Sequence, residues 1–88
     1  MQETTELLRA VNRSADWARY TRGFWAPIAG LSVSAASLNR DLSYAAGSGP
    51  GAGAEVRLTL ALATIAQARE DLDALQLAVA QAREEARR

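Results

Sequence analysis

The last third of the chain carries the feature that most constrains the fold. From residue 55 to residue 87, apolar residues recur at alternating steps of three and four across about four heptads, at Leu58, Ala61, Ile65, Ala68, Leu72, Leu75, Val79, Ala82 and Ala86. This spacing keeps one stripe of an α-helix against a partner helix and favours coiled-coil-like packing. We therefore expect a helix roughly 50 Å long at about 1.5 Å per residue. We expect its helix seam to include Leu58, Ile65, Leu72, Leu75 and Val79.

The same segment contains one conflicting signal. Apolar and polar residues alternate over positions 56–62, as they do in a half-buried strand. No other part of the chain has a pattern that could pair with such a strand, and an isolated strand is not stable. We therefore expect helix here.

Two breaks divide the chain into helical segments. Residues 47–53 contain four glycines and a proline, which predicts a linker. A weaker break extends from Gly23, which can end a helix, to Pro27, which suits the first turn of the next one. The expected helices are residues 3–22, 27–46 and 55–87.

The lengths of these segments predict how they pack. The second helix is too short to cover the third, so the first two together form one kinked arm. The prediction is an all-α antiparallel helical hairpin, with two long or three helices, in a single domain over residues 1–88. A compact three-helix bundle, with the end of the third helix overhanging, is the alternative. Small residues on the expected stripes, among them Ala61, Ala68 and Gly30, favour closely spaced helix axes.

The composition argues against enzyme activity. The chain contains no Cys, His or Lys, so it lacks the usual transition-metal ligands, the usual general base and the Schiff-base residue. Residues 49–54 match a dinucleotide-binding glycine pattern, but no strand precedes them. The acids Glu70, Asp71 and Asp73 do not converge on one point of a helix. We expect no enzyme activity, no metal and no cofactor.

An aromatic cluster is the best candidate for a binding site. Trp17, Tyr20 and Phe24 are spaced three and four residues apart, Trp25 adjoins them and Arg13 lies one turn before Trp17. Either these aromatic residues fill the end of the core at the kink, or they bind a partner together with Arg13. Aromatic side chains and Arg are common anchors at protein interfaces.

These observations predict a non-catalytic structural or adaptor protein of the cytoplasm. It would oligomerise or dock on a larger complex, such as a viral particle or a multi-subunit machine. Several apolar residues lie outside the main stripes, at Leu7, Trp17, Leu60, Leu62 and Leu77. The ten Arg residues are balanced by ten acidic residues. A membrane-associated protein that uses residues 17–44 is one alternative, because positions 23–39 are uncharged and aromatic residues flank them. Weak nucleic-acid binding is another, because residues 9–22 hold four Arg and one Asp.

Overall fold

The computed structural model describes residues 2–88 and contains three helices in that range. They are α1 (Gln2–Arg22), α2 (Trp25–Ser48) and α3 (Ala52–Ala86). Within the described range no residue is in a strand, so the alternation at positions 56–62 is part of α3. The predicted all-α class is confirmed.

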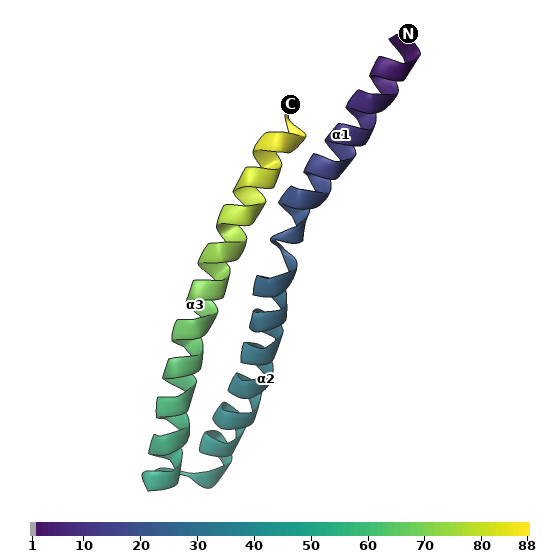
Figure 1. The fold of residues 1–88 in the computed structure, drawn as a ribbon. Coiled ribbons are helices and arrows are strands. Elements are labelled where there is room, and N and C mark those ends of the chain that lie inside the picture. The colour runs from purple at the N-terminus through teal and green to yellow at the C-terminus, as the bar shows by residue number, and fades with distance from the viewer. Residues whose placement is uncertain (1) are drawn as a thin grey trace.

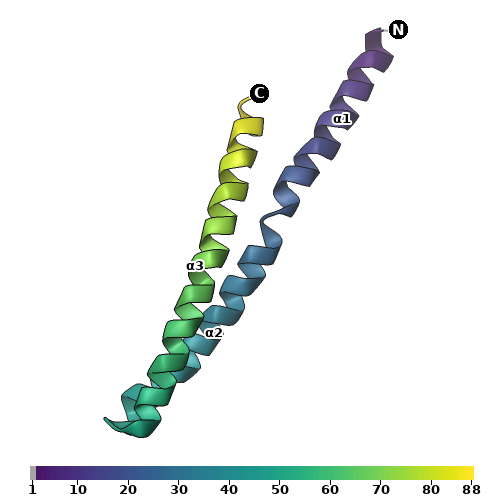
Figure 2. The same ribbon diagram turned by 60° about the vertical axis from the view of Figure 1, so that its left-hand side comes forward.

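The molecule is an elongated hairpin. Helices α2 and α3 lie side by side and antiparallel, and α1 continues the line of α2 past the C-terminal end of α3 (Figures 1 and 2). The Cα atoms extend over 75 × 16 × 13 Å, with a radius of gyration of 20.9 Å. A compact chain of this length has a radius of gyration of about 12 Å. The hairpin with a kinked arm is therefore confirmed, and the three-helix bundle is wrong.

The kink between α1 and α2 is narrower than the sequence predicted. Only residues 23–24 lie outside the helices. The backbone of Phe24 keeps helical dihedral angles, and its N–H donates to the carbonyl oxygen of Thr21 at 3.1 Å. Pro27 falls in the first turn of α2, where a missing N–H leaves no intrahelical bond unmade. The chain therefore bends here and does not reverse.

The turn between α2 and α3 is also shorter than the expected linker. It consists of residues 49–51, and Gly47 and Gly53 both lie inside helices. Gly49 has φ of +74° and Gly51 has φ of +148°, values that L-residues with side chains rarely adopt. Two glycines therefore suffice to reverse the chain, and helix continues up to each side of them.

The core is thin and made of small residues. Among the described residues, the only buried hydrophobic side chains outside proline are three alanines of α3, Ala54, Ala61 and Ala82. Pro27, Ser34 and Asp41 are the buried residues of α2. Small side chains on both helices let the two backbones approach closely.

Across residues 2–88, no helix combines enough length with enough hydropathy to cross a bilayer.

Candidate functional site

Three contacts fix the antiparallel register of the hairpin. A Cβ atom built on Gly23 lies 3.5 Å from the Cβ atom of Ala78, and Gly30, one heptad later, lies against Asp71. Two heptads beyond Gly30, the Arg57 guanidinium stacks 4.7 Å from the centroid of the Tyr44 ring. Because these pairs are separated by seven and fourteen residues, the kinked first arm keeps one register along α3.

The hairpin seam is the line along which α3 meets the first arm, and it differs from the predicted stripe. Two heptad rows of α3 are buried or half-buried there, Ala54, Ala61, Ala68, Leu75 and Ala82 in one row, and Arg57, Thr64, Asp71, Ala78 and Glu85 in the other. Of the five predicted seam residues, only Leu75 belongs to these rows. The larger Leu58, Ile65, Leu72 and Val79 are 37% to 52% exposed beside the seam.

The cause of this rotation is the close approach of the helices. Leucine and isoleucine in the centre of the seam would hold the helix axes apart, whereas alanine, serine and glycine do not. The predicted stripe already contained the alanine row, and its small residues were expected to bring the helices close together. Periodicity did not show that the polar row from Arg57 to Glu85 completes the seam, in place of the large apolar row one position after it.

The most deeply buried polar group of the seam is the Asp41 carboxylate. Its side chain is only 2% exposed, and its Oδ1 accepts a hydrogen bond from Arg57 Nη1 at 2.9 Å and one from Arg40 Nε at 3.3 Å. Arg57 also stacks on Tyr44, so one guanidinium group joins both helices. Sequence analysis missed this cluster because its members are far apart in the chain.

This arrangement shifts the pKa of Asp41. The hydrogen bond from Arg57 is the largest cause and lowers the pKa from its usual 3.8. Burial acts in the opposite direction, and the hydrogen bond and charge of Arg40 add to the lowering. Asp41 is therefore a charged, satisfied group that fixes the register, and it is not open to a substrate.

Gly30 makes room for a second carboxylate in the seam. A Cβ atom at Gly30 would lie 2.5 Å from Oδ2 and 2.9 Å from Cγ of Asp71. Real Cβ atoms essentially never make contacts this short, so a side chain at this position displaces the Asp71 carboxylate. Glycine is favoured here by space, since no positive φ is recorded for it.

One side of the seam is apolar along most of the hairpin. On α3 it carries Leu58, Ile65, Leu72 and Val79, and on α2 it carries Ile28, Leu31, Leu38 and Leu42. We call these eight residues the apolar face. The register places Leu31 near the level of Leu72, and Leu38 near the level of Ile65. Both rows follow the seam on the same rotational side, so in an antiparallel pair they lie on one face.

The opposite side of the seam is more polar, although Val33 and Leu60 are exposed beyond its polar groups. It carries the stacked Tyr44 and Arg57 and the paired Gly30 and Asp71. The hairpin thus has two unlike faces. Large apolar side chains are concentrated on the apolar face, which is unusual for a surface in contact with water.

Part of the predicted aromatic cluster lies at the open end of the hairpin. Here α1 and the last turn of α3 line a hollow of about 350 Å³, with Arg13, Asp16, Trp17, Tyr20, Glu85, Ala86 and Arg88 around it. Arg19 pairs with Asp16 at 3.0 Å and lies 5.8 Å from the Tyr20 ring centroid. The structure therefore brings Arg13, Trp17 and Tyr20 together.

Phe24 and Trp25 lie apart from that hollow, at the kink. Their rings meet edge to face at a centroid distance of 6.4 Å. Trp17 is 45% exposed and Trp25 is 65% exposed, so neither tryptophan fills the end of a core. Partner binding by Arg13, Trp17, Tyr20, Phe24 and Trp25 stays a prediction.

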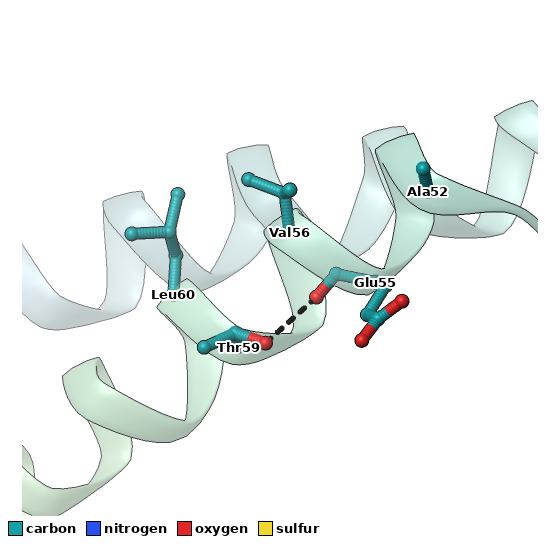
Figure 3. A pocket seen from close by; sticks show the side chains of 5 residues that line it. All are labelled: Ala52, Glu55, Val56, Thr59 and Leu60. Atoms are coloured by element: carbon teal, nitrogen blue, oxygen red, sulfur yellow. Dashed lines mark hydrogen bonds between the residues drawn. The ribbon is translucent and has the colours of Figure 1, made fainter.

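A second hollow lies on the first turns of α3. Figure 3 shows that Ala52, Glu55, Val56, Thr59 and Leu60 line it, all from this one helix. The Thr59 hydroxyl donates to the carbonyl oxygen of Glu55 at 2.9 Å. A hollow on the flank of one helix, with its hydroxyl group already bonded to the backbone, offers no convergent polar groups to a ligand.

Within the part of the chain that the structure describes, acidic residues do not gather in groups of three that could hold a metal ion. Comparisons of the chain with protein-family models, curated proteins and solved structures find no match.

Proposed function

We propose that this chain is a non-catalytic structural or adaptor subunit that works by packing its hairpin against protein. The observation that carries the proposal is the contrast between an alanine core and exposed large apolar side chains. Only Ala54, Ala61 and Ala82 form the buried hydrophobic set of the described residues, whereas leucines and tryptophans face outwards on all three helices. A chain that buries so little is stabilised by what binds it.

The total surface supports this proposal. The accessible surface is 6910 Å², whereas a compact monomer of 9.4 kDa exposes about 5,000 Å². The excess of roughly 1,900 Å² comes from the elongated shape. An excess of total accessible surface on that scale, with large apolar side chains exposed on it, is typical of subunits that are complete only within an assembly.

The polar groups support a role without catalysis. Asp41 is held by Arg57 and Arg40 inside the seam, and Asp71 packs against Gly30. These groups therefore serve helix packing. A multi-subunit complex in the cytoplasm is the setting that we propose.

The Arg and aromatic residues of α1 give less support to nucleic-acid binding. Asp16 and Glu85 line the same hollow as Arg13, and Asp16 also pairs with Arg19. Carboxylates at this point repel phosphate and reduce the local positive charge that such binding needs.

Site-specific photo-crosslinking in the native cell tests the proposal. A photoreactive residue at Leu72, on the apolar face, is expected to give protein adducts, whereas one at the exposed Glu70 is the matched control and gives far fewer. Absence of any protein adduct at Leu72 contradicts the proposed function. Lipid adducts at Leu72 would favour the membrane alternative.

A further inference from the structure

We infer that the occupant of the apolar face is a second copy of this chain, and that the two hairpins pair face to face as a four-helix bundle. This inference rests on the proposed function and specifies its partner. It concerns Ile28, Leu31, Leu38 and Leu42 of α2 together with Leu58, Ile65, Leu72 and Val79 of α3.

The chemistry of the face fits another hairpin of the same kind. Its large side chains recur at steps of three, seven and four on α2 and at steps of seven on α3, which keeps each row on one side of its helix as in helical bundles. Positions 23–39, which include much of the α2 half, contain no charged residue. No rim of like charge therefore surrounds the α2 half to repel an identical surface.

The area also suits a second copy. A specific interface removes about 800 Å² from each partner, and this hairpin exposes roughly 1,900 Å² more than a compact chain of its mass. One identical hairpin packed along the apolar face would remove an interface area of about 800 Å² from each of the two chains.

The row on α3 is evenly spaced and therefore matches itself when it is turned end for end. In that arrangement Leu58 lies opposite Val79 of the second copy, and Ile65 lies opposite Leu72 of the second copy. At the edge of the same row, Glu55 comes level with Arg83 of the second copy. This pairing of opposite charges occurs twice across a two-fold axis, so we place the two turns at opposite ends of the bundle.

Arg69 marks the position of the axis. It lies at the outer edge of the row, midway between Ile65 and Leu72, and is exposed. Its long side chain extends from the rim into water in both copies. The backbones of the two Arg69 residues are therefore close neighbours, and their charged ends are solvated.

Sedimentation of the full chain and of two matched variants tests the pairing. We expect the wild type to sediment at twice the 9.4 kDa chain mass. Leu72→Glu places a charge in the interface from both copies and should raise the dissociation constant by about 100-fold or more. Leu77→Glu makes the same change on the opposite side of α3, where Leu77 is 61% exposed, and should change it by less than about threefold.

Two results would overturn the inference. One is a wild type that stays monomeric at about 100 μM, a concentration well above the dissociation constants of specific dimers. The other is an equal loss of dimer in Leu72→Glu and Leu77→Glu. Should Leu72→Glu lose its helical circular dichroism, the wild type still decides, because the melting temperature of a dimer rises with concentration and that of a monomer does not.

Disulfide trapping tests the orientation. The chain has no Cys, so an introduced thiol is the only one present. Arg69→Cys is expected to form covalent dimers much faster than Glu70→Cys, its neighbour on another side of the helix. Equal rates would show that the two turns do not lie at opposite ends.

The proposed function and this inference fail in different ways. A monomeric wild type that still gives protein adducts at Leu72 refutes the second copy and keeps the subunit role. A monomer that co-sediments with anionic phospholipid vesicles would instead assign the face to lipid.

Discussion

The α2–α3 stem and the α1 arm are both regular helix, but they are held in different ways. In the stem, Ser34 and Asp41 are buried against alanines of α3, and α3 packs mainly against α2. In the arm, residues 3–19 are all exposed, and α1 meets α3 only near its last turns. One register of small residues therefore organises the stem, and nothing comparable organises the first turns of α1.

The difference shows where tertiary stability comes from in this chain. Apolar residues occur in both regions, and Leu7, Leu8 and Val11 of the arm are as hydrophobic as any residue in the stem. They gain nothing from packing, because α3 ends at Ala86 before it reaches their level (Figures 1 and 2). A helix of this length in water depends on a partner surface more than on its own propensity.

The largest effect should come from filling the seam. Ala61 is 3% exposed, so Ala61→Leu forces the helices apart and should lower the free energy of unfolding by about 1–3 kcal/mol. The matched change in the arm, Ala10→Leu, should stay within about 0.5 kcal/mol. Urea unfolding followed by circular dichroism measures both. Equal effects would show that the stem is no more tightly packed than the arm.

Two glycines of α2 separate packing from helix propensity. Gly47 has no neighbour within 4 Å, so Gly47→Ala should raise stability by about 0.5–1 kcal/mol through backbone entropy. Gly30→Ala makes the same change where Asp71 occupies the space, and it should fall below wild type. Thermal unfolding of the two variants gives the comparison, and a stabilised Gly30→Ala would contradict the close approach.

The Asp41 cluster predicts a dependence on pH that only the stem should show. Its pKa is lowered in the folded state, so the unfolded chain binds the proton more readily. The stabilisation is therefore complete above the usual value of 3.8 and is lost as the pH falls through the lowered folded-state pKa. Acid titration of stability should show net proton uptake on unfolding in this range, and Asp41→Asn should reduce it. An unchanged titration in Asp41→Asn would show that the carboxylate is not held by Arg57.

The smallest effect is expected in the arm. Trp17 is half-exposed beside the hollow at the open end, so Trp17→Ala should change stability by about 0.5 kcal/mol or less. Circular dichroism melting of the dilute monomer measures it. A large loss of helicity would instead support the alternative interpretation that the aromatic residues fill the end of the core at the kink.

The sequence predicted the fold of the hairpin better than it predicted which residues lie in the seam and on each face. Apolar spacing and helix lengths were enough for the antiparallel hairpin, and Gly23 located the kink. The rotation of α3 could not be obtained in the same way, because periodicity leaves several neighbouring stripes open and favours the one with the largest residues. The ion pair between Asp41 and Arg57 could not be predicted either. It depends on the register between two helices, which the sequence of neither helix specifies alone.

The most direct test of the account is the contact that defines the seam, observed by nuclear Overhauser effects in solution. The account predicts cross-peaks between the α-protons of Gly23 and the methyl group of Ala78, whose Cβ lies 3.5 Å from the position of a Cβ on Gly23. Cross-peaks from Gly23 to the methyl groups of Val79, with none to Ala78, would contradict it. That result would mean that α3 is rotated to bury its large apolar residues and that the apolar face does not exist.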